Sequence, residues 1–415
     1  MLKHFYHRTS VITRLQQGPL GPYLEDLALT LHQQGYAPST IREYVYAYET
    51  FGRWLSQKGY TVANTDEPTI TLYLHGLRRS PAGKLPKAGR GLTHLRRLMQ
   101  QRGIVPVCPL TTPLTAADAW LRRYEQYLHQ VLGAAPSTRQ CYLRIAQRFL
   151  ATYSMAGPLD WSAIQAQHVA SFVRQEAATK QRFGRRVPAV AMRAFLRFLT
   201  FSGAIPLGLE AAVPIPRSWK HAALPPRLTT EEVARVLAAC REETPQDVRD
   251  RAILFLLAHL GLRAQEITTL CLEAIDWRRG HLIIRSGKTH AERVLPLSQE
   301  VGSALVTYLT HGRPASTSRV VFLHYRPPFR PFAGASAITQ IARRALLRAG
   351  VTVRPSMGAH TFRHTVASQM VNQGASFKEV ADILGHRSLQ TTGIYAKLDL
   401  EALTQIALPW VGGTL

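Results

Sequence analysis

The chain has 415 residues, enough for about two to four domains that each bury a hydrophobic core. Hydrophobic residues make up 46% and charged residues 19%, a balance typical of folded rather than disordered proteins. The 51 Lys and Arg against 26 Asp and Glu give a formal charge of +25, which indicates a polyanionic partner, most often nucleic acid. The sequence has no run of about 18 apolar residues and no basic amphipathic tail, so a membrane partner is not expected.

The cysteines and the N-terminus indicate the compartment. Cys108, Cys141, Cys240 and Cys271 do not pair at CxxC spacing, so neither a zinc site nor a disulfide framework is indicated. The first residues, MLKHFYHRTSVITRLQQG, lack the continuous apolar region of a signal peptide. We therefore expect a cytoplasmic protein that associates with the nucleoid.

Two Pro- and Gly-rich stretches divide the chain. They are RGIVPVCPLTTP (102–113) and IPLGLEAAVPIPRSWKHAALPP (205–226). We predict three domains, over residues 1–110, 111–216 and 217–415.

The first two segments resemble each other. APSTIREYVYAYETFGRWL (37–55) matches APSTRQCYLRIAQRFLATY (135–153) at an offset of 98 residues. LRRLMQQRGIVP (95–106) matches FLRFLTFSGAIP (195–206) at an offset of 100 residues. In both copies Pro-Ser-Thr is a typical helix start. The nearly constant offset predicts a duplicated helical unit.

The third segment mixes helices and strands. Thr229 and Glu232 predict a capping box at a helix start, and Gly261 is expected to break the next helical stretch. HLIIRSGKTHAERVLPLS (281–298) predicts a β-hairpin with its turn at Gly287 and Lys288. We also expect a short strand at RVVFLH (319–324) and helices over about 336–349, 360–373, 376–384, 388–396 and 400–408.

Five stretches in this segment carry side chains suited to a phosphate. They are GLRAQEI with Arg263 and Glu266, SGKTHAERV with Lys288, HTFRH with His360 and Arg363, LGHRS with His386, and TTGIYAK with Tyr395. Guanidinium groups can hold phosphate oxygens in pairs, a tyrosine can attack phosphorus, and lysine or histidine can transfer protons. Zinc binding by His360 and His364 is not predicted, because no third ligand lies at suitable spacing.

In order and spacing, these stretches resemble the catalytic domain of the tyrosine recombinases, the phage integrase and Xer-like family, over about 226–396. The family's Leu-Arg-x-x-Glu-Leu appears as LRAQEI, its hairpin lysine motif as GKTHAERVLPL, its His-x-Leu-Arg-His as HTFRH, and its nucleophile segment Thr-Thr-x-x-Tyr as TTGIY. Phe362, Ile267 and Lys397 depart from the usual residues of these motifs. None of the three departures changes a catalytic side chain.

The resemblance implies a mainly α fold with a small antiparallel β-hairpin or sheet in the C-terminal domain. It implies a tyrosine-recombinase catalytic fold (217–415) preceded by two helical core-binding-like (SAM-like) domains. Residues 111–216 take the place of the family's core-binding domain. Residues 1–110 would be a second such domain that binds flanking DNA or another protein; its basic stretch 75–102 has no acidic residue and favours DNA.

The resemblance also implies the functional residues. They are Arg263, Glu266, Lys288, His360, Arg363, His386 and Tyr395. Tyr395 would attack the scissile phosphate and form a 3′-phosphotyrosine, while Lys288 protonates the departing 5′ oxygen. His360 would accept the tyrosine proton, and Glu266 would orient Arg263. The family reaction needs no metal, ATP or other cofactor.

The implied partner is double-stranded DNA at specific recombination sites, bound by a homotetramer on two sites, alone or with sister recombinases. A C-terminal apolar helix (400–410) would be exchanged between subunits. The duplicated N-terminus favours a recombinase of a mobile element, for integration, excision or transposition. Three alternatives stay open: a type IB topoisomerase-like enzyme, a catalytically silent DNA-binding protein, and a metal-dependent nuclease. The motifs do not give the DNA target sequence.

Overall fold

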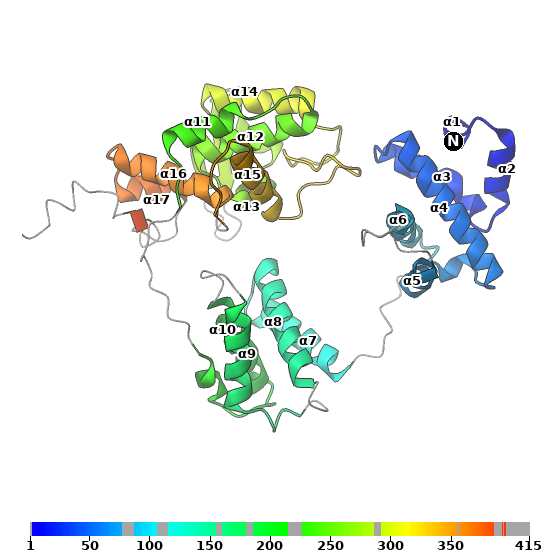
Figure 1. Cartoon of the computed structure of the whole chain (residues 1–415), viewed down its shortest axis with the longest axis horizontal. Coiled ribbons are helices and arrows are strands. Elements are labelled where there is room, and N and C mark those ends of the chain that lie inside the picture. Colours follow the sequence, from blue (N-terminus) through cyan, green and yellow to red (C-terminus); the bar gives the residue numbers. More distant parts are fainter. Residues whose placement is uncertain are drawn as a thin grey trace, which may run out of the picture. The chain divides into compact units, whose positions relative to one another are not determined.

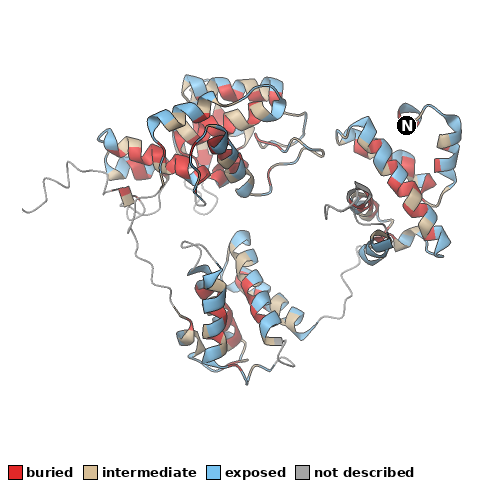
Figure 2. Ribbon diagram, viewed as in Figure 1, coloured by how far each residue is buried: buried red, intermediate tan, exposed pale blue. Residues whose placement is uncertain are grey.

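The computed structural model describes residues 2–76, 87–105, 115–154, 160–179, 186–214, 226–285, 292–354, 357–385, 392, 394 and 395. By its internal contacts the chain divides into two units, one of residues 107–220 and one that holds residues 1–106 and 221–415. Separate hydrophobic clusters lie within residues 2–105, 124–213, 228–362 and 366–395 (Figure 2). The three domains expected over 1–110, 111–216 and 217–415 stay a prediction.

Residues 2–105 form helices around their own apolar cluster (Figure 1). These helices are α1 (Leu2–Phe5), α2 (Thr9–Gln17), α3 (Gly21–Gln33), α4 (Pro38–Gln57), η1 (Val62–Asn64), α5 (Glu67–Gly76) and α6 (Lys87–Gln101). As predicted, α4 begins at the proline of Pro-Ser-Thr. It packs against α3 and α6 through the face that carries Tyr48, Phe51 and Leu55, all fully buried.

Residues 115–214 repeat that helical pattern. Their elements are α7 (Ala116–Gln126), the π-helical turn η2 (Tyr127–Val131), α8 (Pro136–Ser154), α9 (Ala166–Ala178), α10 (Arg186–Phe201) and η4 (Leu209–Ala212). Like α4, α8 begins at the proline of Pro-Ser-Thr, and α10 occupies the position that α6 occupies in the first copy. Both pairs of helices that the sequence matches predict are therefore present.

Residues 226–385 carry helices around a small sheet. The elements are α11 (Thr230–Ala238), α12 (Pro245–Leu260), α13 (Ala264–Thr268), η5 (Leu272–Ala274), β1 (Ile275–Asp276), β2 (His281–Arg285), β3 (Glu292–Pro296), α14 (Gln299–Thr307), η6 (Tyr308–Gly312), α15 (Ser336–Arg348), α16 (Ala359–Asn372) and α17 (Phe377–Leu384). The apolar run AILFLLAHL makes α12 hydrophobic on most sides, which is typical of a buried helix. Accordingly, α12 contacts α11, α14, α15 and α16.

The sheet has the antiparallel order β1-β2-β3. Leu282 and Ile284 of β2 point into the core, and Ile284 pairs with Arg293 of β3. The expectation of a mainly helical fold with a small antiparallel sheet is confirmed. The predicted capping box of Thr229 and Glu232 is present at the start of α11. Strand β1 was not expected.

The predicted strand RVVFLH (319–324) is wrong. Within the described residues this segment forms only isolated bridges, Cys271 with Val320 and Leu323 with Pro331. Its carbonyl groups accept hydrogen bonds from arginine side chains. The half-buried Arg313 donates to Val320 and Val321, and the buried Arg249 donates to Leu323. Side-chain donors thus take the place of a neighbouring strand.

Other expectations fall outside the described residues. The helix expected over 400–408, the hairpin turn and most of the helix over 388–396 lie there. Of that last helix, only Thr392, Ile394 and Tyr395 are described. No helix in the described ranges is long and apolar enough to cross a bilayer.

Gly261 lies at the end of α12, just before α13 begins. It ends α12 in the left-handed conformation, with φ of 57° and ψ of 31°. A Cβ atom at this position would lie 3.0 Å from Leu384 and 3.3 Å from Val366. The position therefore needs glycine both for its backbone and for its close packing.

We predict that Gly261→Ala lowers the free energy of unfolding by about 2–3 kcal/mol, from left-handed backbone strain plus overpacking. Gly280→Ala is the matched control, because Gly280 also has positive φ (65°) but no described atom lies within 4 Å of its added Cβ. It should lose only about 1 kcal/mol. Chemical denaturation of the full chain measures both; equal losses would contradict the packing argument.

Candidate active site

Arg263 lies where α12 gives way to α13. Its backbone N–H donates to the Glu266 carboxylate at 2.8 Å, and its Nη1 donates to the same carboxylate at 2.9 Å. Its Nη2 donates to the backbone oxygen of Gly385 at 2.7 Å. The side chain is 33% exposed, so the guanidinium group keeps a face toward solvent.

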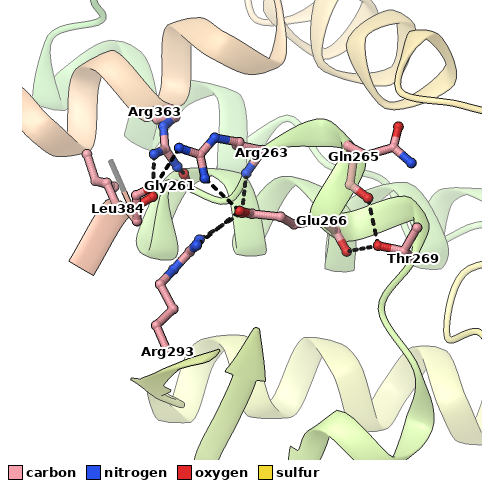
Figure 3. Close-up of polar contacts among 9 residues, drawn as sticks. Gly261, Arg263, Gln265, Glu266, Thr269, Arg293, Arg363 and Leu384 are labelled. Atoms are coloured by element: carbon pink, nitrogen blue, oxygen red, sulfur yellow. Dashed lines mark hydrogen bonds and ion pairs between the residues drawn. The ribbon is translucent and has the colours of Figure 1, made fainter. Parts of the chain in front are cut away.

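Arg363 lies in the second turn of α16 and is almost fully buried. Its Nη1 donates to the backbone oxygen of Gly261 at 2.8 Å, and its Nη2 donates to that of Leu384. Burial, followed by the charge of Arg263, lowers the pKa of Arg363 to about 9. The two arginines reach the carbonyls of consecutive residues, Leu384 and Gly385, so their guanidinium groups converge at the end of α17 (Figure 3).

Glu266 lies between two arginines. Besides Arg263, it accepts two hydrogen bonds from Arg293 of β3, at 3.0 Å and 2.7 Å. Burial acts to raise the pKa of Glu266, but the hydrogen bonds and charge of Arg293 and then those of Arg263 outweigh it and lower the pKa. The carboxylate is therefore ionised and fixes both guanidinium groups.

His360 and His364 of α16 lie near Tyr395, and His364 contacts its hydroxyl. The rings of His360 and His364 lie 6.1 Å apart, and His364 Nδ1 lies 2.6 Å from the Tyr395 hydroxyl. Tyr395 is 1% exposed and packs in the apolar cluster that includes Val366 and Leu384. The tyrosine hydroxyl thus sits against a histidine that directly follows a buried arginine.

Desolvation controls the protonation of this group. It lowers the pKa of His364 to about 4, helped by His360 and Arg363, and it also lowers the pKa of His360, although that side chain is exposed. Burial raises the pKa of Tyr395 to about 12 against the opposing charge of Arg363. At neutral pH both imidazoles are neutral and the phenol keeps its proton.

The structure brings together five of the seven residues singled out by sequence. Arg263, Glu266, His360, Arg363 and Tyr395 gather through the contacts above. Lys288 and His386 lie outside the described residues. In the sequence, Lys288 falls between β2 and β3, and His386 directly follows Gly385, whose carbonyl accepts a hydrogen bond from Arg263.

Sequence reasoning missed two participants. His364 was considered only as a metal ligand, and Arg293 only as part of a motif. The sequence held a signal for Arg293, because the strand ERVLP places this cation close to the predicted hairpin turn that carries Lys288. The signal for His364 was its place directly after Arg363 on the same helix. In the described part of the chain no three His, Cys, Asp or Glu side chains gather as a metal site.

Known proteins resemble this chain over different lengths. The model of the phage integrase family matches residues 226–401. The Sinorhizobium fredii protein named "Putative integrase/recombinase y4rA" is 34% identical over 412 residues, 99% of this chain and 99% of that protein. The tyrosine recombinase XerD of Corynebacterium glutamicum is 29% identical over 304 residues, 70% of this chain and 95% of XerD.

Solved structures share the fold. The XerH site-specific recombinase bound to its difH substrate superposes with a TM-score of 0.54 at 18% identity, over 74% of this chain and 99% of XerH. A dimer of lambda integrase residues 75–356 bound to a COC′ core site gives a TM-score of 0.53 at 18% identity, over 67% of this chain and 94% of that one.

The fold is that of a tyrosine-recombinase catalytic segment, with two arginines, histidines and a tyrosine gathered at the end of α17. The similarity to an integrase/recombinase spans nearly every residue of both chains. The chain belongs to the phage integrase family of tyrosine recombinases and is a site-specific recombinase.

We predict that the free energy of unfolding of His364→Gln falls less in acid than that of the unmodified protein. The folded-state pKa of His364, about 4, lies below its ordinary value of 6.5, so its contribution is present above pH 6.5 and is lost as the pH falls toward 4. Between pH 7.5 and pH 5 this amounts to about 2 kcal/mol. Urea unfolding at both pH values measures it.

The matched control is His281→Gln, because His281 is an exposed histidine of β2. It should lose the same free energy in acid as the unmodified protein. If His364→Gln also lost as much as the unmodified protein, the buried contact with Tyr395 would not be what resists protonation.

Proposed function

We propose that the protein cuts and rejoins double-stranded DNA through a covalent 3′-phosphotyrosine at Tyr395. The observation that carries this proposal is the convergence of Arg263 and Arg363 on neighbouring carbonyls, within one cluster that also holds Tyr395. Two guanidinium groups at one point form a site for a phosphodiester, because they can neutralise the charge of its pentavalent transition state. The formal charge of +25 supports DNA as the partner.

In this mechanism the Tyr395 oxygen attacks phosphorus, and the bond from phosphorus to the 5′ oxygen breaks. Arg263 and Arg363 hold the non-bridging oxygens, and His386 and His360 donate to them. Lys288 gives a proton to the departing 5′ oxygen. The 5′ hydroxyl of a partner duplex then attacks the phosphotyrosine, which rejoins the strand and regenerates the tyrosine. The phosphotyrosine retains the bond energy, so ATP is not needed, and the two arginines supply the charge stabilisation that a metal ion would give.

The tyrosine proton needs an acceptor within hydrogen-bonding distance. The sequence predicts His360, but the hydroxyl contacts His364 at 2.6 Å, so we propose that His364 takes the proton. With pKa values of about 12 for Tyr395 and about 4 for His364, transfer before attack would cost on the order of 10 kcal/mol. The proton therefore leaves only as the new bond to phosphorus forms.

We also propose that residues 111–216 and 217–415 contact the core of the recombination site, and that residues 1–110 bind flanking DNA. Lambda integrase provides a precedent for assembly, since one structure is a tetramer on a Holliday junction. We infer that this protein likewise acts as four copies on two DNA sites. Integrase/recombinase relatives along the full length favour a mobile-element role in integration, excision or transposition.

The proton acceptor is tested by pH profiles of single-turnover cleavage between pH 6 and 9. We predict that His364→Gln slows cleavage by about 10²- to 10⁴-fold at pH 7 and gains tenfold per pH unit, because hydroxide must then remove the proton. His360→Gln should slow cleavage with a nearly flat profile. A unit slope in His360→Gln instead would restore the assignment made from the sequence.

The nucleophile is tested by trapping. We expect a covalent adduct on the 3′ phosphate of nicked duplexes taken from DNA flanking the protein's own gene, in the presence of EDTA. Tyr395→Phe should abolish the adduct, and Arg263→Ala should slow its formation by about 10²- to 10³-fold, through loss of transition-state stabilisation.

Three outcomes would oppose the proposal. An adduct that survives Tyr395→Phe would move the nucleophile, and cleavage that leaves no adduct and that EDTA prevents would favour a metal-dependent nuclease. Sequence-specific binding without any adduct would favour a silent DNA-binding protein. Relaxation of supercoiled DNA by the protein alone would favour the topoisomerase-like alternative.

A further inference from the structure

Arg293 belongs to the hairpin motif GKTHAERVLPL but is not among the seven residues that the sequence singled out. It lies on β3, opposite Ile284 of β2, and its side chain is only 12% exposed. Its two terminal nitrogens meet the two oxygens of Glu266 at 3.0 Å and 2.7 Å, a bidentate pair (Figure 3). Paired hydrogen bonds of this kind fix orientation as well as distance. Glu266 is therefore held from one side by β3 and turned toward Arg263 on the other.

The charges at this point do not balance. Three guanidinium groups, those of Arg263, Arg293 and Arg363, surround one carboxylate, that of Glu266, which leaves a net charge of +2. Without Arg293, Glu266 would form a one-to-one pair with Arg263 and offset most of its positive charge. Arg293 thus occupies the carboxylate and leaves the charge of Arg263 available to an anion.

Arg293 also lies against the glycine that Arg263 binds. A Cβ atom on Gly385 would come within 2.5 Å of Arg293 Nη1, so this side chain packs directly on the Gly385 backbone. The Gly385 carbonyl accepts the hydrogen bond of Arg263 Nη2. One side chain therefore supports Arg263 twice, through Glu266 and through Gly385.

We infer that Arg293 is a positioning residue of the strand-cleavage reaction, which holds Glu266 and Gly385 so that Arg263 meets the scissile phosphate with its charge intact. This inference rests on the proposed function. It predicts that Arg293 acts on the charge of the phosphate although it touches no reacting atom. A side chain with only a structural role would change the amount of folded protein but not the response to that charge.

The first test replaces the cation at nearly constant length. Arg293→Met should slow single-turnover formation of the covalent adduct by about 100-fold, since a misplaced catalytic group costs about that much. Arg285→Met is the matched control, because Arg285 lies on the neighbouring strand with a 78% exposed side chain paired to Glu292. The control should cleave at the unmodified rate, and rates are taken per folded protein, from melting curves.

The second test removes the charge from the substrate. In a duplex with a methylphosphonate at the scissile position, a methyl group replaces one charged oxygen, so Arg263 has less charge to meet. The loss caused by Arg293→Met should then fall from about 100-fold to about 10-fold or less, because the effect depends on charge. Equal losses on the two substrates would overturn the inference and leave a structural role.

A double variant shows whether Arg293→Met loses activity only because it misfolds. Arg293→Met leaves Glu266 buried with one partner fewer, whereas Glu266→Gln with Arg293→Met removes both charges and frees Arg263 from neutralisation. The double variant should form adduct at least tenfold faster than Arg293→Met alone. No recovery would overturn the inference. Failure of the unmodified protein to form any adduct would instead reject the proposed function, so the two failures are distinguishable.

Discussion

The guanidinium groups of Arg263 and Arg363 converge on two consecutive backbone carbonyls, those of Leu384 and Gly385, and the rest of the catalytic segment is arranged to hold them there. Burial, and then the like charge of Arg263, lowers the pKa of Arg363. The carbonyls lie at the C-terminal end of α17, the negative end of the helix dipole. The Glu266 carboxylate offsets part of the remaining positive charge.

Backbone geometry creates these acceptors. Both α12 and α17 end in glycines with left-handed conformation, Gly261 with φ of 57° and Gly385 with φ of 64°. The N–H groups of these glycines return to earlier carbonyls, of Leu257 in α12 and of Ala381 and Asp382 in α17, while the last carbonyls of a helix end need partners from outside the helix. Here arginine side chains take them: Arg363 binds the Gly261 carbonyl, and the two arginines share those at the end of α17. These two arginine side chains therefore also cap two helices.

Local patterns in the sequence were enough to predict part of this site. Arg263 and Glu266 are three residues apart at a helix start, so their contact follows from helical spacing. The pairing of Arg293 with Glu266 joins a strand to a helix across 27 residues, and no periodicity of the sequence reports it. The contact between His364 and Tyr395 likewise spans 31 residues. Such contacts depend on how the elements pack, which the motifs do not specify.

In the fold, too, local sequence patterns predict some features, while others depend on how distant segments pack. The helix break at Gly261 and the hairpin over 281–298 have local causes, a glycine and an alternation of apolar residues, and sequence reasoning found both. The stretch 319–324 is apolar enough to be a strand, but its carbonyls are taken by Arg249 and Arg313 from elsewhere in the chain. Composition alone does not separate a strand from an extended segment held by side chains.

The carbonyl contacts also determine how the proposed site would respond to DNA. A phosphate oxygen carries a larger negative charge than a carbonyl oxygen, so a guanidinium group would bind phosphate more strongly than it binds the helix end. Under the proposed mechanism, Arg263 and Arg363 would meet the phosphate from the positions that the carbonyls of Gly385 and Leu384 define. Tyr395 belongs to the same apolar cluster as Leu384, so one helix end helps to place both the arginines and the nucleophile. A protein without DNA keeps the tyrosine hydroxyl protonated against His364.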